Sequence, residues 1–182
     1  MICDDDLTPL RPSPLFKRKP CFENALVQSI GGGNTMVMNR AALDLIQDTA
    51  PRARGVVAHD WWAYQIVSGA GGVVIYDPTP TVLYRQHGSN TVGANDTLFA
   101  GLRRMRQVAQ GRFRDWNDAN LAALERSRPW LTGDAATALD HFQMARHGPL
   151  PHRLRSLRRA GVIRQRFRGT AALWAAALLN KL

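Results

Sequence analysis

The segment that decides the fold class is HDWWAYQIVSGAGGVVIYDPTPTVLYR, residues 59–85. Its first part carries apolar residues at helical spacing, and the glycines within 69–72 predict the end of that helix. The apolar run 73–76 then predicts a buried strand, and a second strand is expected at 81–85 after a proline turn. Helix, glycine stop and strand pair together indicate an α/β fold for residues 1–95.

The preceding segments fit the same fold class. Residues 4–20 contain four prolines, which predicts an irregular chain. A short helix is expected over 22–30, ended by three glycines, and a strand-like stretch follows at 35–38. A further helix is expected over 39–50.

Everything after residue 95 is patterned as helix, so we divide the chain into an α/β part, 1–95, and an all-α basic part, 96–182. Two or three short strands with two or three helices do not make an independent sheet with both faces covered. The first part is therefore interpreted as half of a fold.

The surplus of basic charge is confined to the second part. Residues 1–100 hold eight basic and nine acidic residues, whereas residues 101–182 hold sixteen basic and five acidic ones. The basic residues are densest from Arg153 to Arg168. This asymmetry indicates a polyanionic partner, either nucleic acid or an anionic membrane leaflet, and carries no information on chemistry in the first part.

Composition excludes several classes of protein. The two cysteines, Cys3 and Cys21, cannot make a disulfide framework or, unaided, a four-ligand zinc site. The first residues lack the basic and apolar pattern of a signal peptide. The longest apolar run, 171–179, has nine residues, where a bilayer crossing needs roughly 20. We therefore expect the protein in the cytoplasm.

The first candidate site is the glycine run Gly31-Gly32-Gly33, followed by Asn34 and Thr35. Consecutive glycines let the backbone approach a ligand closely and present N–H groups to it. An ordinary helix stop followed by a turn would have the same sequence. The run lacks the Gly-Lys-Ser/Thr ending of a phosphate-binding P-loop, so that kind of site is excluded.

The second candidate site is His59-Asp60-Trp61-Trp62. Asp60 stands where the N-cap of the expected helix would be, and a carboxylate fixed at a helix start can act as a general base. The tryptophans could line a sugar-sized cleft. A plain N-cap with tryptophans in the core would give the same pattern, and His59 is interpreted as an orientation or packing residue.

The third candidate site follows the second expected strand and reads YRQHGSN, residues 84–90. Ligands of open α/β sheets gather at strand ends. Arg85 offers a planar fork for phosphate oxygens, and His87 can bind a metal or a diphosphate. A polar loop without function would look the same.

Together these blocks resemble the bacterial family-2 glycosyltransferases, and among them the rhamnosyltransferase-like branch of cell-surface polysaccharide synthesis. The resemblance rests on FENALVQ at 22–28, GGNTM at 32–36, HDWW at 59–62 and LYRQHGSN at 83–90. It covers residues 2–95 and extends more weakly into the basic part. The four blocks in this order are specific, whereas any one of them alone is a weak signal.

The resemblance implies a GT-A fold, of which residues 1–95 form the C-terminal, acceptor-side portion. Asp60 matches the catalytic base of inverting members. His87 matches a histidine that contacts the metal or the diphosphate in many members. The residues implied to bind donor and acceptor are Gly32, Gly33, Asn34, Trp61, Arg85 and Gln86.

The implied reaction transfers a sugar, with inversion, from a nucleotide-diphospho-sugar to a cell-surface glycan or lipid-linked acceptor. A divalent cation, Mg or Mn, is implied at the diphosphate. The family's nucleotide-binding half and its Asp-x-Asp metal motif do not precede these blocks, and Asp4-Asp5-Asp6 is a poor substitute because no strand comes before it. We therefore expect an amino-terminally truncated transferase, and activity of this chain alone is left open.

Two other functions stay open for the basic part. Residues 150–182 combine arginines with Leu, Trp and Phe, which suits a peripheral segment on the anionic inner face of the plasma membrane. The same apolar residues could instead pack against the body of the protein. A non-catalytic nucleic-acid-binding module is less favoured, because basic residues alternate with apolar ones and no DNA- or RNA-binding motif is present.

Overall fold

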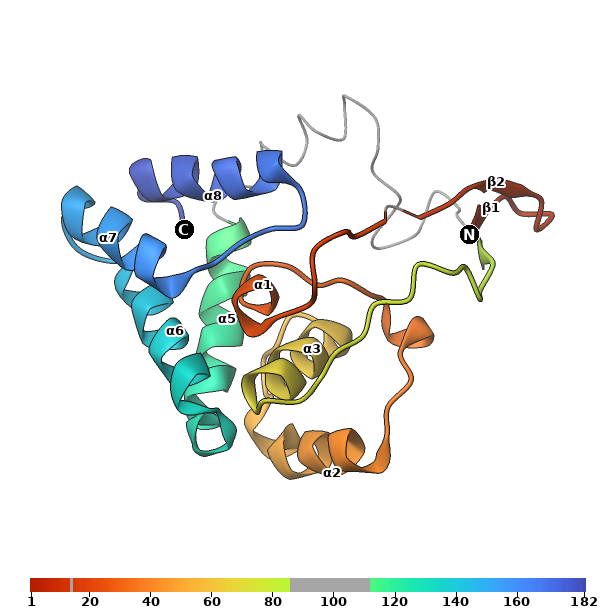
Figure 1. Ribbon diagram of the computed structural model, residues 1–182, viewed down its shortest axis with the longest axis horizontal. Coiled ribbons are helices and arrows are strands. Elements are labelled where there is room, and N and C mark those ends of the chain that lie inside the picture. Colours follow the sequence, from red (N-terminus) through yellow and green to blue (C-terminus); the bar gives the residue numbers. More distant parts are fainter. Residues whose placement is uncertain (14, 86–111) are drawn as a thin grey trace.

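A computed structural model describes residues 1–13, 15–85 and 112–182. Its strands form one small mixed sheet, and helices make up most of the rest of the molecule (Figure 1). The fold is therefore mixed α/β with a mostly helical C-terminal region, which confirms the sequence prediction at this level. The boundary that we placed at residue 95 lies outside the described residues.

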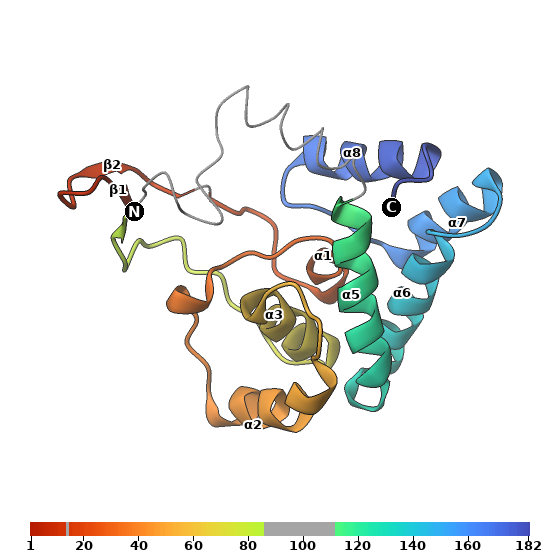
Figure 2. The same cartoon turned by 180° about the vertical axis from the view of Figure 1, so that it is seen from behind.

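The sheet has the strand order β2-β1-β3, formed by β1 (Ile2–Cys3), β2 (Pro9–Arg11) and β3 (Tyr84–Arg85). Strand β1 pairs antiparallel with β2 and parallel with β3. The N-terminal ammonium group donates to Val82 O at 2.9 Å, and the Tyr84 N–H donates to Met1 O at 2.8 Å. Figures 1 and 2 show this sheet at one end of the molecule, away from the helices.

The helices fall into two groups along the chain. The first group consists of α1 (Phe22–Ala25), α2 (Arg40–Thr49) and α3 (His59–Gly69), with 3-10 turns at Gly33–Thr35 and Ala50–Arg52. The second group consists of α5 (Arg112–Arg126), α6 (Gly133–Met144), α7 (Leu150–Ala160) and α8 (Phe167–Leu178), with a 3-10 turn at Arg128–Trp130. None of the helices in the described ranges combines the length and the apolar content of a membrane span.

Side-chain caps explain where two of these helices begin. Helix α2 follows Asn39, whose Oδ1 accepts the Ala42 N–H at 2.9 Å. Helix α6 follows Thr132, whose Oγ1 accepts the Ala135 N–H at 3.2 Å. Each cap satisfies a backbone donor that the first turn of a helix leaves without a partner. The helix expected over 39–50 is thus confirmed.

One hydrophobic core joins the two groups of helices. Buried residues around α1 and α3, such as Leu26 and Ile66, share it with Leu124 of α5, Phe142 of α6 and Leu157 of α7. Removing a side chain of this kind from water stabilises the folded state by about 1.5–3 kcal/mol. The described structure is therefore held together chiefly by helix packing.

The strand expected over 73–76 is wrong. Val73 and Ile75 are 79% and 84% exposed. Val74 packs against a small apolar cluster, and the Tyr76 ring meets the Phe16 ring edge-on at 5.3 Å. The segment is extended, but within the described ranges no strand pairs with it, so its backbone groups join no ladder.

Four other expectations also change. The strand expected over 81–85 shortens to β3, and the helix expected over 22–30 ends at Ala25. The stretch 35–38 is not a strand, and Val37 in it is 99% exposed. The region 4–20 contains β2, which begins at a proline and lies at the edge of the sheet, where a residue without an N–H is tolerated.

Candidate functional site

The glycine bend lies directly against the start of α3. Within the Gly33–Thr35 turn, the Thr35 N–H and Oγ1 both donate to Gly32 O, at 2.9 and 2.8 Å. The His59 imidazole packs so closely on Gly33 that a Cβ at this position would overlap its Nε2 atom. With His59 in this position only glycine fits at 33, which gives the glycine a steric role that the sequence alone did not reveal.

Asp60 is the second residue of α3 rather than its N-cap, which is Ala58. The Oδ2 atom of Asp60 accepts the Gly33 N–H at 3.2 Å, and its Oδ1 accepts the Trp61 N–H at 2.6 Å. The expected N-cap role is therefore wrong. The carboxylate is nevertheless held in a defined orientation in the first turn of a helix, where the backbone N–H groups favour an anion.

Four of the predicted site residues come together at this point: Gly32, Gly33, Asn34 and Asp60. Asn34 is exposed, and its Oδ1 lies so near Gly32 that a Cβ there would meet it at 2.8 Å. A carboxylate, an amide and backbone groups thus gather on one partly exposed area that can contact a hydroxylated ligand. Two depressions on the surface of the described residues, one beside Gln143 and one beside Ser68, do not include Asp60.

Trp61 lies in the interior rather than on an open wall. It is 7% exposed, its Nε1–H donates to Ala25 O at 2.7 Å, and its ring meets the Trp116 ring edge-on at 6.5 Å. Trp62 is 3% exposed and belongs to the hydrophobic core. This burial fits the alternative of core tryptophans, and a contact between Trp61 and a sugar stays a prediction.

The third candidate site is described only at its first residues. Arg85 is exposed at the end of β3, in the sheet that Figures 1 and 2 show apart from α3. Gln86 and His87 lie outside the described residues. The structure therefore does not bring Arg85 to Asp60, and the expected roles of Gln86 and His87 stay predictions.

The divalent cation that the resemblance implies stays a prediction. No group of three or more His, Cys, Asp and Glu among the described residues could hold a metal ion. The Oδ1 atom of Asp4 accepts the N–H groups of Asp6 at 3.0 Å and Thr8 at 2.8 Å. This carboxylate shapes the turn between β1 and β2, which is a structural use of the acidic triplet.

A buried polar network behind the site was missed by the sequence analysis. The Tyr64 hydroxyl accepts the Cys21 N–H at 3.0 Å and lies 3.1 Å from Asn24 Oδ1. The Asn24 amide donates to Ile163 O at 2.8 Å, and Gln165 Nε2 lies 3.4 Å from Asn24 Oδ1. Burial raises the pKa of Tyr64 above its ordinary value. Tyr64 lies about 40 positions from Cys21 and Asn24, and Asn24 lies about 140 positions from Ile163 and Gln165, so no local sequence signal could have revealed this network.

Comparison with known proteins gives one partial match. No protein-family model matches the sequence, and no solved structure is significantly similar to it. The chain is 32% identical over 82 residues to the dTDP-rhamnosyl transferase RfbG of Shigella flexneri, a match that covers 43% of this chain and 28% of that protein. The matched part thus spans less than a third of the relative, and this weak similarity supports a distant relationship to glycosyltransferases.

Proposed function

We propose that this chain is the acceptor-side part of an inverting glycosyltransferase of the GT-A type. Its donor is a nucleotide-diphospho-sugar, and its acceptor is a cell-surface glycan or a lipid-linked sugar. The observation that carries the proposal is the contact between Asp60 and the Gly33 N–H, because it joins two separate blocks of the family resemblance at 3.2 Å. The partial similarity to a dTDP-rhamnosyl transferase supports the same class of reaction.

In the proposed reaction, Asp60 is the general base. It removes the proton from an acceptor hydroxyl while the hydroxyl oxygen forms a bond to the anomeric carbon. The bond from that carbon to the diphosphate oxygen breaks in the same step, so the configuration inverts and the nucleoside diphosphate leaves with its electron pair.

The two hydrogen bonds of Asp60 leave room for this role. A carboxylate has about four lone-pair sites, and the N–H groups of Gly33 and Trp61 occupy one on each oxygen. Each oxygen keeps a further site for an acceptor hydroxyl. The backbone donors therefore fix the orientation of the base without neutralising it by proton transfer.

No step of this proposal is assigned to a metal ion, and no group of three or more His, Cys, Asp and Glu among the described residues could hold one. The Mg or Mn ion that the resemblance implies stays a separate proposal, tied to His87 and to residues beyond those described. Arg85, Gln86 and Trp61 keep their proposed roles in binding donor or acceptor.

The test is transfer from dTDP-rhamnose, the donor suggested by the name of the similar protein, measured as release of dTDP. It uses the protein encoded by the complete reading frame that contains these residues. Asp60→Asn should lower turnover by at least about 100-fold, which is the lower end of what a general base contributes. The matched control is Asp77→Asn, because Asp77 is exposed and its Oδ1 also accepts a backbone N–H, that of Thr79, at 2.8 Å. Equal turnover in both variants would remove Asp60 from the role of base.

A further inference from the structure

The outward face of α8 is apolar along almost its whole length. The exposed positions of this face are Phe167, Arg168, Ala171, Ala172, Ala175, Leu178 and Leu179, and the exposed Asn180 of the C-terminal turn lies outside it. At 3.6 residues per turn the positions of this face fall within an arc of about 140°. The opposite side of the helix, with Leu173, Ala176 and Ala177, is buried in the core.

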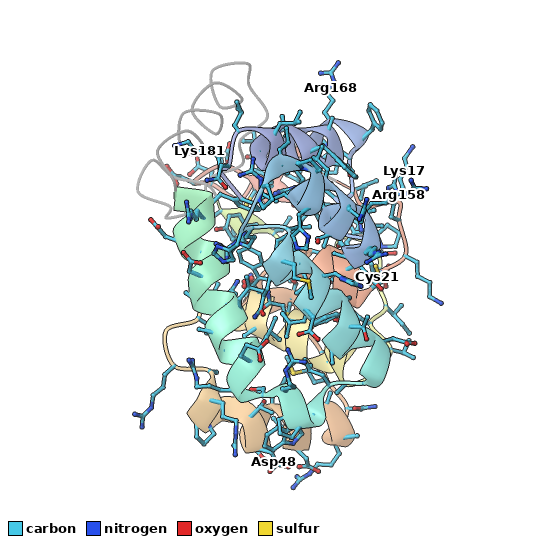
Figure 3. The ribbon with its side chains drawn as sticks, turned by 90° about the vertical axis from the view of Figure 1, so that its left-hand side faces the viewer. Lys17, Cys21, Asp48, Arg158, Arg168 and Lys181 are labelled. Carbon is cyan, nitrogen blue, oxygen red and sulfur yellow. The ribbon has the colours of Figure 1, made fainter. Side chains whose placement is uncertain are left out.

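The large side chains on this face are strongly exposed. Phe167 is 78% exposed, Leu179 71% and Leu178 53%. Helix α8 forms the upper end of the molecule in Figure 3, where the labelled side chain of Arg168 points away from the body. The helix therefore packs against the body with one apolar face and exposes a second apolar face.

The chain around α8 carries positive charge only. Residues 141–182 contain nine basic residues and no acidic one. Arg146 and Arg153 are used internally: Arg146 pairs with Asp118 at 2.6 Å, and Arg153 is 9% exposed. The exposed basic residues of this stretch are Arg155, Arg158, Arg159, Arg166, Arg168 and Lys181.

A second basic segment joins this surface from the other end of the sequence. Lys17, Arg18 and Lys19 are all exposed. Gln165, between α7 and α8, fixes this segment because its Oε1 accepts the Arg18 N–H at 2.9 Å and its Nε2 donates to Arg18 O at 3.1 Å. Figure 3 shows Lys17 and Arg158 in the same upper part of the molecule, opposite the end that carries Asp48.

We propose that the outward face of α8 and the basic residues around it form a docking surface for an anionic lipid bilayer. Apolar side chains enter the boundary between headgroups and acyl chains, and the surrounding arginines and lysines contact lipid phosphates. A nucleic acid would satisfy the basic residues but would leave Phe167, Leu178 and Leu179 exposed to water. The combination of the two kinds of residue therefore favours the bilayer, and this inference does not depend on the proposed glycosyl transfer.

The test is sedimentation of the whole chain with vesicles of phosphatidylglycerol mixed with phosphatidylcholine, and with vesicles of phosphatidylcholine alone. The unchanged protein should bind the anionic vesicles at least about tenfold more strongly, and added salt should weaken that binding. The double variant Arg158→Glu/Arg168→Glu should lower the affinity by at least about tenfold. The double variant Phe167→Ser/Leu179→Ser should lower it by about tenfold without changing the net charge.

Two matched controls lie away from this surface. Arg40→Glu/Arg54→Glu makes the same change of net charge at exposed positions in and after α2, and Val37→Ser removes an apolar side chain that is 99% exposed. Both should bind vesicles as the unchanged protein does.

Equal binding by the charge variant and its control, or equal binding to both kinds of vesicle, would overturn the proposal. Salt-sensitive binding to a DNA duplex together with indifference to anionic vesicles would overturn it in favour of a nucleic-acid surface.

Discussion

The segments 35–38 and 73–76 and the helices of residues 112–182 place most of their large apolar side chains in opposite environments. Val37, Val73 and Ile75 come from stretches that the sequence predicts as strands, and all three are at least 79% exposed. Leu124 of α5 and Phe142 of α6 have no exposed surface. Among the large apolar residues of the helical region, the outward face of α8 is the main exception.

The difference reflects how each kind of element pairs the hydrogen-bonding groups of its backbone. A helix pairs its N–H and C=O groups internally, so an apolar stripe needs only a neighbouring surface to become buried. A strand needs a second strand for its backbone groups as well as a surface for its side chains. In the described part of the chain the segment 73–76 has the surface, on the side of Val74, but not the neighbouring strand.

The largest expected effect tests this comparison directly. Phe142→Ala should lower the free energy of unfolding by about 3–5 kcal/mol, because it opens a cavity in the shared core. Ile75→Ala should lower it by less than about 0.5 kcal/mol, because Ile75 is already in water. Chemical denaturation of both variants measures the two values. A large cost for Ile75→Ala would break the comparison, since it would mean that the segment 73–76 is buried in solution.

Two glycine substitutions, with intermediate expected losses of unfolding free energy, refine the comparison. A Cβ on Gly69, at the end of α3, would lie 2.7 Å from Leu131 Cδ2 and 2.8 Å from Phe22 Cε2. These side chains are held by the core, so Gly69→Ala should cost about 1–3 kcal/mol of unfolding free energy. Gly33→Ala meets only the exposed imidazole of His59, which can rotate away, and should cost less than about 1 kcal/mol.

The double variant Gly33→Ala/His59→Ala checks the second half of this prediction. Removing the imidazole should recover most of whatever stability Gly33→Ala loses, and a double-mutant cycle measured by chemical denaturation gives the coupling between the two residues. Additive effects would show that His59 does not rest on Gly33. A cost for Gly33→Ala above that for Gly69→Ala would reverse the ranking of the two regions.

The helices were the part of the fold that the sequence predicted best. Helix α2 could be placed because Asn39 and the apolar spacing after it are local signals, and α3 could be placed from the apolar spacing after Asp60 and the glycines that follow it. The strand expected over 73–76 failed because its apolar residues do not say whether a partner strand is present.

The candidate site shows the same division between local and long-range information. Separate sequence blocks predicted Asp60 and Gly33 as site residues, and only the folded structure brings them together through one hydrogen bond. The packing of His59 on Gly33 had no signal other than the glycine itself. The links from Asn24 to Ile163 and from Gln165 to Arg18 span about 140 positions, so neither periodicity nor spacing could have predicted them.

The smallest effect concerns the buried polar network around Tyr64, and it is a pH dependence. Burial raises the pKa of Tyr64 from its ordinary value of 10.0, so the folded protein keeps this proton at a pH where the unfolded chain loses it. The stability that Tyr64 contributes is therefore complete below pH 10 and declines as the pH rises above that value. Tyr64→Phe should lower the free energy of unfolding by about 1 kcal/mol near neutral pH and flatten its decline above pH 10. Tyr84→Phe, at an exposed tyrosine of β3, is the control for loss of a tyrosine hydroxyl. Denaturation curves between pH 7 and 11 measure both profiles. An undiminished alkaline decline in Tyr64→Phe would mean that another group causes it. The first group to replace would then be the neighbouring Cys21, because burial also raises the pKa of its thiol.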